Sequence, residues 1–170
     1  MKRILALILA LLCFGCFFAC TDYNGNKGGA DGNNIDPDAT YAETDITAIK
    51  DKMIADLKIE GAMDMGEAIL LSYGIDEKDI KESACFITMD GVFTSEAIII
   101  KAVDDDAAQR IGEKLEVRHG ALLEQSKNYD ADNYALAQEC EVKTYGHIVT
   151  LFFAPDHEGM TEILEASLSE

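Results

Sequence analysis

The sequence contains little positive charge. Lys and Arg number 14 against 32 Asp and Glu, so the formal net charge is −18. Without Lys2 and Arg3, at the extreme N-terminus, it would be −20. Nucleic-acid binding depends on clustered basic side chains that neutralise phosphates, and a chain this acidic is repelled by them. We therefore expect no nucleic-acid partner.

Residues that commonly bind metals or act as nucleophiles are also scarce. There are three His and five Cys, and only Cys85 and Cys140 lie beyond residue 20. No His lies at zinc-ligand spacing from either cysteine, and no Ser stands in a G-x-S-x-G pattern. The run of aspartates at 104–106 is typical of a helix N-terminus rather than a metal site. The sequence thus predicts no metal, no cofactor and no recognisable catalytic residue.

Only one long segment is uninterrupted by polar residues. The apolar run 4–14 follows Lys2 and Arg3 and leads into a very polar stretch. A membrane-spanning helix needs about 20 apolar residues, so this run is too short to span a bilayer comfortably. A positive start followed by a short apolar run predicts a secretory signal peptide that is cleaved.

Two cysteines, each preceded by a small residue, end the apolar run as in bacterial lipoprotein signals. The chain turns polar at Thr21, directly after Cys20, whereas cleavage at Cys16 would expose the phenylalanine at position 17. We predict a signal peptide over residues 1–20 and a diacylglycerol on Cys20, with Cys16 as the alternative. An uncleaved anchor or an ordinary secretory signal is the less favoured interpretation.

Residues 21–42 are rich in Gly, Asn and Asp and show no apolar periodicity. Such a segment buries too little surface to offset chain entropy, so we predict a flexible acidic tether. Its first polar residues resemble the start of a calcium loop, but Lys27 and Asn33 stand where that loop needs Gly and Glu. The remaining residues, 43–170, are enough for a single domain with one core.

Apolar periodicity predicts the elements of this domain. Helices are expected near 45–60, 66–72, 104–127 and 156–168, and strands at 85–89, 94–103, 140–144 and 147–154. Asp90-Gly91 is a strong hairpin signal. The order α-α-β-β-α-β-β-α predicts an α+β two-layer sandwich, an antiparallel four-stranded sheet with helices on one face.

The strand–turn–strand–helix order occurs twice, which indicates a possible internal repeat. Cys85 and Cys140 open the two units, and Gly91 and Gly146 turn their hairpins. If the units pair through their first strands, the cysteines lie at opposite ends of that pair. Their separation then exceeds the roughly 7 Å Cα distance that a disulfide allows, so we predict two free, buried thiols.

Several short segments, in order along the chain, resemble a known family. They read Tyr-Gly-Ile-Asp at 73–76, Ile-Ile-Ile-Lys at 98–101, Gln-Ser-Lys-Asn-Tyr at 125–129 and Tyr-Gly-His-Ile-Val at 145–149. With the signal and tether, they resemble lipoproteins of clostridial-type Gram-positive bacteria that carry a C-terminal domain of unknown function. The resemblance covers most of residues 45–168 and implies an envelope location and a single domain. It implies no catalytic or binding residues.

Three side chains are candidates for contact with a ligand or partner. Lys101 ends an apolar strand before three aspartates, where it would either contact an anion or, as is more common for a strand-end lysine, pair with those aspartates. Tyr129 and Tyr145 are of a residue type enriched at recognition surfaces, although tyrosines more often close the edge of a core.

Two functions from different classes fit these observations. A lipid anchor, a tether and a small domain without a catalytic motif favour a non-catalytic binding or interaction module on the outer face of the cytoplasmic membrane. Its partner would be an envelope protein or a small ligand. The alternative is a small extracytoplasmic hydrolase whose site is assembled from scattered acidic residues and His. A deep pocket with a carboxyl of raised pKa would favour the hydrolase.

Overall fold

The computed structural model describes residues 41–89 and 95–169, all of which belong to one compact unit, Asn34–Glu170. The predicted signal peptide, both candidate lipidation sites (Cys16 and Cys20) and the Asp90-Gly91 turn lie outside the described residues. Tyr41, which the sequence places at the end of the tether, is buried in the domain core.

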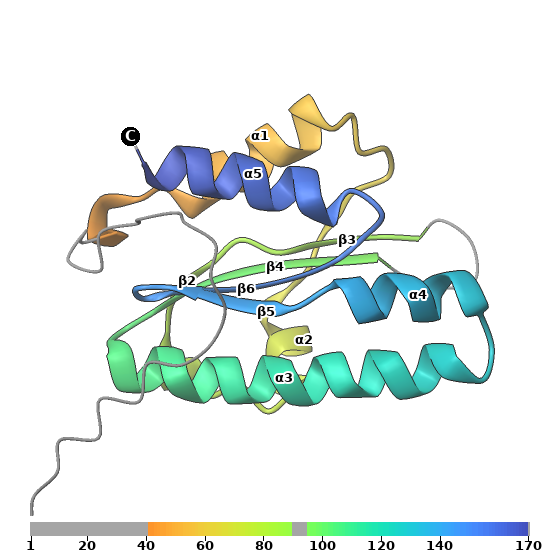
Figure 1. Ribbon diagram of the computed structural model, residues 1–170. Coiled ribbons are helices and arrows are strands. Elements are labelled where there is room, and N and C mark those ends of the chain that lie inside the picture. Colours follow the sequence, from red (N-terminus) through yellow and green to blue (C-terminus); the bar gives the residue numbers. More distant parts are fainter. Residues whose placement is uncertain (1–40, 90–94, 170) are drawn as a thin grey trace, which may run out of the picture. The chain divides into compact units, whose positions relative to one another are not determined.

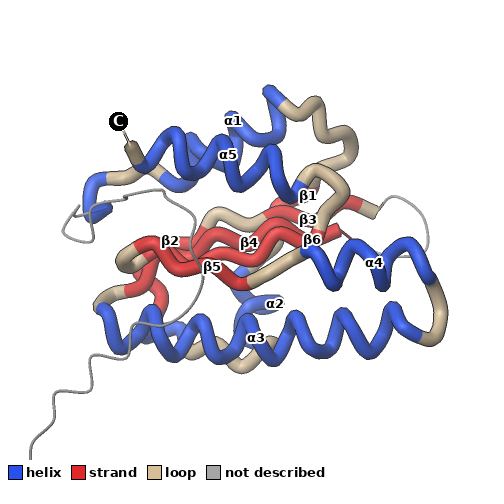
Figure 2. Tube along the Cα trace, viewed as in Figure 1, coloured by secondary structure: helices blue, strands red, loops and turns tan. Residues whose placement is uncertain are grey.

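Five helices and six strands make up the described chain (Figures 1 and 2). The helices are α1 (Ile46–Asp56), α2 (Glu67–Ser72), α3 (Asp105–Lys127), α4 (Ala131–Glu139) and α5 (His157–Leu168), with short 3₁₀ turns at Tyr41–Glu43 and Glu77–Asp79. The strands are β1 (Met63–Asp64), β2 (Ile80–Ser83), β3 (Phe86–Thr88), β4 (Ser95–Ala102), β5 (Val142–Tyr145) and β6 (Ile148–Phe153).

Local chemistry sets the ends of these helices. The side chains of Asp45, Asp104 and Asp130 accept hydrogen bonds from the first backbone amides of α1, α3 and α4. Such caps satisfy donors that have no partner inside the helix. Gly74 follows α2 with φ of +82°, a left-handed conformation that glycine adopts without strain. The aspartate run at 104–106 was predicted to lie at a helix N-terminus, and Asp104 does cap α3.

The strands form one antiparallel sheet with β4 and β6 at its centre. The order is β1-β3-β4-β6-β5, and β2 pairs with the other end of β4, on the edge that β3 also occupies. β2 and β3 thus act as one interrupted strand beside β4, with a break at Ala84 and Cys85. The α+β class is confirmed, but the sheet has six strands rather than the predicted four. β1, which has only two residues, and β2, whose polar residues are typical of a connection, were not predicted from the sequence.

Helices cover both faces of this sheet (Figure 1). Ile98 and Ile100 of β4 lie in a buried cluster with residues of α2, α3 and α4, whereas Ile99 lies in a second cluster with α1 and α5. The predicted two-layer sandwich with helices on one face is therefore wrong. Alternate residues of a strand point to opposite faces, so three consecutive buried isoleucines require cover on both sides.

The order strand–strand–helix does occur twice, as β3-β4-α3 and β5-β6-α5, but α3 and α5 pack on opposite faces. A twofold axis normal to the sheet would place both helices on one face, so the predicted repeat is not supported. The two units meet through their second strands, β4 and β6, rather than their first. Cys85 precedes β3 and Cys140 precedes β5. Three strand spacings of about 4.8 Å each separate these two strands in the sheet. Both cysteines are free and buried, as predicted.

Two arginines of α3 neutralise acids buried on their side of the sheet. Arg118 donates to both carboxylate oxygens of Glu96 in β4, and its Cζ lies 4.6 Å from the centre of the Tyr73 ring. Arg110 donates to both oxygens of Asp79, at 2.9 and 2.7 Å. Glu96 and Asp79 are each 4% exposed. Bidentate pairing of this kind supplies a buried carboxylate with strong donors.

Candidate functional site

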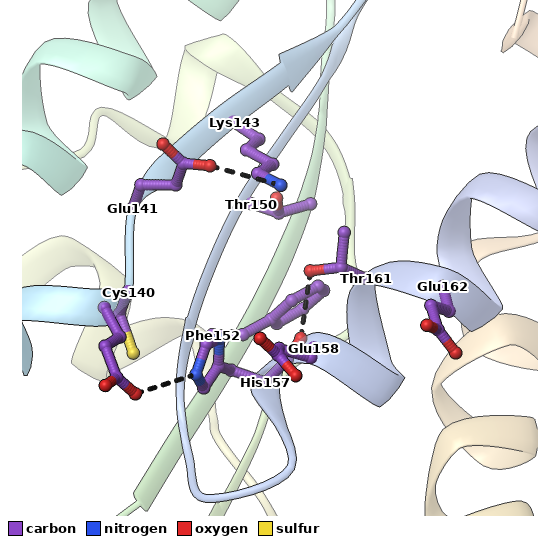
Figure 3. Close-up of a pocket in the computed structure, with 10 residues that line it drawn as sticks. Cys140, Glu141, Lys143, Thr150, Phe152, His157, Glu158, Thr161 and Glu162 are labelled. Carbon is purple, nitrogen blue, oxygen red and sulfur yellow. Dashed lines mark hydrogen bonds and ion pairs between the residues drawn. The ribbon is translucent and has the colours of Figure 1, made fainter. Parts of the chain in front are cut away.

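A groove of about 420 Å³ lies where β5 and β6 meet the first turns of α5 (Figure 3). Its volume is within the range of small-molecule sites, roughly 300–1,000 Å³. β5 is the last strand of the sheet on this side, and α5 packs over the sheet next to α1. The groove therefore has a sheet floor and a helical wall.

The floor is built by strand pairing. Lys143 of β5 lies directly opposite Thr150 of β6, and Phe152 follows two residues later, so the three side chains share one face. This is the face that carries α1 and α5, because Phe152 belongs to the cluster they form. Figure 3 shows Thr150 and Phe152 between the β5 side chains and the helix.

The wall is one side of α5. Its lining residues are His157, Glu158, Thr161 and Glu162, which recur at intervals of one and three along the helix. The Thr161 hydroxyl donates to the His157 backbone carbonyl at 2.9 Å, a bond within the helix. The two glutamates are four residues apart, a spacing that places like charges on neighbouring turns and costs roughly 0.2–0.5 kcal/mol.

The groove is acidic, and its charges are only partly paired. Lys143 Nζ lies 3.2 Å from Glu141 Oε1, and His157 Nε2 lies 3.8 Å from Glu139 Oε2. Among the residues the structure describes, Glu158 and Glu162 have no ion pair. Four glutamates thus line the groove with a single lysine, and the two on the helical wall have no cationic partner within the described residues.

Thr150 is the one buried polar side chain of the floor. It is 1% exposed and lines the groove, and within the described chain its hydroxyl has no hydrogen-bond partner. The hydroxyls of Tyr41 and Ser126 are also unpaired, but they are completely enclosed by protein. The Thr150 hydroxyl differs because it borders an open groove. Because it borders the groove, this hydroxyl is available for a hydrogen bond to a bound ligand.

Cys140 also lines the groove, and its environment bears on a catalytic function. Burial raises the pKa of this thiol to about 11, so near neutral pH the sulfur is a thiol rather than a nucleophilic thiolate. Within residues 41–89 and 95–169, no three His, Cys, Asp or Glu side chains are grouped as a metal site would require. The arrangement is suited to binding a ligand by charge and hydrogen bonds.

Lys101 lies inside the fold. It is 4% exposed, and its Nζ donates to the Thr44 carbonyl and to Glu82 Oε2, the latter at 3.2 Å. It therefore pairs with Glu82 of β2, not with the aspartates that follow β4. These contacts join β4 to β2 and to the start of α1, and they occupy the ammonium group with protein partners.

The two candidate tyrosines occupy different environments. Tyr145 is 9% exposed, and its hydroxyl donates to Glu165 Oε1 at 3.0 Å, a bond that ties β5 to α5. Burial raises the pKa of Tyr145 well above its usual value, and the neighbouring Glu165 carboxylate adds to the shift. Tyr129, after α3, is 81% exposed. Neither tyrosine lines the groove.

Apart from Cys140, which was predicted only as a buried thiol, no residue of the groove was predicted from the sequence. Glutamates occur throughout this acidic chain, so Glu158 and Glu162 on α5 are not distinctive in the sequence. A signal did exist in β6, where Thr150 interrupts an otherwise apolar strand, Ile148–Phe153. A polar residue in such a strand must find a partner or a solvent-filled space.

No helix in the described part of the chain has the length and apolar character needed to cross a bilayer.

A family model described as "Domain of unknown function (DUF4358)" matches residues 53–154, a range that begins within α1 and ends before α5. The match confirms a domain of unknown function and carries no information on lipidation or source. No curated protein and no solved structure matches the chain significantly.

Proposed function

The chain belongs to the DUF4358 family, and from that premise we propose that it is a non-catalytic binding module of the cell envelope. In this proposal a lipid on Cys20, with Cys16 as the alternative, holds the protein at the outer face of the cytoplasmic membrane. The tether lets the domain reach a small ligand or an envelope protein. The apolar run 4–14 and the cysteines that follow it support the anchor.

One observation carries the binding function: the acidic groove with the unpaired, buried hydroxyl of Thr150 on its floor. A ligand-binding site needs concavity, a few oriented polar groups and charges free to interact, and the groove provides all three. The raised pKa of Cys140 argues against a cysteine hydrolase at this position. Tyr129, which is far more exposed than most side chains of its size, is the proposed contact for a protein partner.

A screen of small molecules by thermal shift tests the binding function. We expect at least one compound to raise the unfolding midpoint of the wild type and to have a much smaller effect on Thr150→Val. The compound should be recovered chemically unchanged. A screen without any Thr150-dependent compound would contradict binding in the groove, and turnover of the compound would contradict the non-catalytic proposal.

Labelling with a fatty-acid probe tests the anchor. The wild type should incorporate the probe, Cys20→Ala should not, and Cys16→Ala should still be labelled. If Cys16→Ala alone abolishes labelling, Cys16 is the modified residue. If neither substitution reduces it, the lipid anchor is wrong.

A further inference from the structure

The sheet ends at β5, and the backbone of this strand indicates what kind of partner binds there. β5 is last in the order β1-β3-β4-β6-β5, and no described strand pairs with its outer side. We infer that β5 binds an extended, basic segment of another protein, which joins the sheet as an added antiparallel strand. This inference rests on the proposed binding function and names the class of partner.

The hydrogen bonds of β6 determine which backbone groups of β5 face outward. The last residue of β4 donates its N–H to the His147 carbonyl at 2.8 Å, so the odd-numbered residues of β6 bond to β4 and the even-numbered ones to β5. The even-numbered residues lie opposite Tyr145 and Lys143. Val142 and Thr144 therefore turn their N–H and C=O groups away from β6. Within the described chain these groups have no hydrogen-bond partner.

The other edges of the sheet are protected against strand addition, whereas β5 is not. β1 has only two residues, and the pairing of β2 with β4 shifts its register between Ile80 and Glu82. Very short strands and β-bulges are common devices that keep other chains from pairing. β5 pairs with β6 over four consecutive residues without a shift, and Thr144 is exposed. Its outer side therefore presents the regular donors and acceptors that strand addition uses.

The charge beside this edge determines which strand binds best. Glu141 and Lys143 line the groove together with Glu139 and Glu158 (Figure 3). Lys143 Nζ lies 3.2 Å from Glu141 Oε1, so an added strand would meet a surface that is acidic on balance. A second copy of this chain, with a formal net charge of −18, would be repelled. A basic strand would be attracted, because opposite charges on neighbouring strands form favourable pairs.

Strand geometry also determines the residue pattern of the partner. Side chains alternate between the two faces of a sheet, so every second residue of the added strand lies on the face that carries the groove. Lysine suits these positions, because its long side chain can reach the glutamates of the groove. The intervening residues lie beside Val142 and Thr144, on the face that α3 covers, where β-branched residues are favoured. The expected partner is thus an extended segment in which basic and β-branched residues alternate.

Isothermal titration of the full chain in a non-ionic detergent with a hexapeptide of alternating lysine and threonine tests the inference. Thr144→Pro removes one outward N–H and should lower the affinity by at least about tenfold. An edge strand tolerates proline where the N–H faces solvent, so the variant should fold. The matched control Thr144→Val keeps the N–H and the branched side chain, and it should change the affinity less than about twofold. Equal affinities for the two variants would overturn the inference.

Peptides with methylated amides test the same hydrogen bonds without changing the protein. In an antiparallel pair the peptide's threonines lie opposite Val142 and Thr144 and exchange hydrogen bonds with them. N-methylation of the threonines should therefore lower the affinity by at least about tenfold. N-methylation of the lysines, whose N–H groups face away from β5, should lower it less than about twofold. Equal losses for the two peptides, or the reverse pattern, would overturn the inference.

A charge variant tests the basic character of the partner. Glu141→Gln should lower the affinity for the peptide several-fold, whereas Glu116→Gln, which removes the same charge from an exposed position of α3, should lower it less than about twofold. If both variants weaken binding equally, the peptide is held only by the overall charge and the inference is wrong. A dimer of the full chain that Thr144→Pro dissociates would also overturn it, because a second copy would then occupy the edge.

The outcome separates this inference from the proposed function. If a small compound binds in a Thr150-dependent manner and the peptide does not bind, the groove is a binding site but the added strand is wrong. If neither binds, both proposals fail.

Discussion

The two faces of the sheet bury polar groups in different ways. On the α3 face, the carboxylates of Glu96 and Asp79 each receive two hydrogen bonds from an arginine of the same helix. On the α1/α5 face, Lys101 has protein partners, but Thr150 has none within the described residues and borders the groove. The α3 face thus pairs its buried charges within the protein, and the α1/α5 face leaves a hydroxyl open to the groove.

Breaking the buried pair on the α3 face should have the largest effect. Arg118→Leu would leave the carboxylate of Glu96, 4% exposed, without its cationic partner and should lower the free energy of unfolding by about 3–5 kcal/mol. Urea denaturation measures the change. Lys127→Leu, which removes a partner of the exposed Glu124, is the control and should cost less than about 1 kcal/mol. Similar losses for both variants would show that burial of Glu96 is not decisive.

The α1/α5 face is closed at the β5-β6 hairpin by tight contact with Tyr41. Gly146 has φ of +56°, and a Cβ added there would lie 2.8 Å from Tyr41 Cδ2. Gly146→Ala should therefore destabilise the protein by about 1–3 kcal/mol. Gly66→Ala is the control, because Gly66 has an ordinary φ of −70° and open space around it. Gly66→Ala should have the higher midpoint of thermal unfolding. Equal midpoints for the two variants would argue against close packing at Tyr41.

The second ion pair on the α3 face, Arg110 with Asp79, should make the stability of the protein depend on pH. Hydrogen bonds from Arg110 hold the pKa of the Asp79 carboxyl below its ordinary value of 3.8. A lowered pKa in the folded state stabilises the protein above pH 4 and loses that effect as the pH falls through the folded pKa. Asp79→Asn should therefore be less stable than the wild type at pH 7, and the difference should shrink below pH 4. Because Arg110 is half-exposed, solvent screening makes this effect smaller than that of Arg118. A pH-independent difference would contradict the role of charge.

Removing the free hydroxyl of the groove should have the smallest effect on stability. Thr150→Val replaces an unpaired hydroxyl by a methyl group of similar shape and should leave the free energy of unfolding within about 0.5 kcal/mol or raise it. Thr161→Val is the matched comparison, because that hydroxyl donates to the His157 carbonyl, and it should cost about 1 kcal/mol. A large loss in Thr150→Val would mean that its hydroxyl has a structural partner.

The sequence predicts much of the fold because its strongest patterns are local. The apolar stripe of α1, the Asp104 cap of α3 and the hairpin at Gly146 each depend on residues close together in the chain. The predicted number of layers, two, was wrong, although Ile98 to Ile100 contained the evidence. A sheet covered on one face alternates apolar and polar residues, and three consecutive isoleucines do not.

The groove could not be predicted in the same way. Its floor comes from two strands and its wall from the helix that follows them. Its glutamates do not stand out in a chain with 32 acidic residues. Only Thr150, by interrupting an apolar strand, was distinctive. Lys101 was selected instead because its neighbours in sequence are acidic, but its partners, Thr44 and Glu82, come from elements that the sequence does not place beside it.

The pairing of α1 with α5 also determines the order in which the domain can fold. These are the first and last α-helices of the described chain, they pack against each other on one face, and about 100 residues separate them. Ordering such a long loop costs chain entropy, and contacts between distant segments slow folding. The α3 face, built largely from the residues in between, can form first. Until α5 docks, the groove lacks its helical wall, so we expect the groove to be the last part of the domain to take shape.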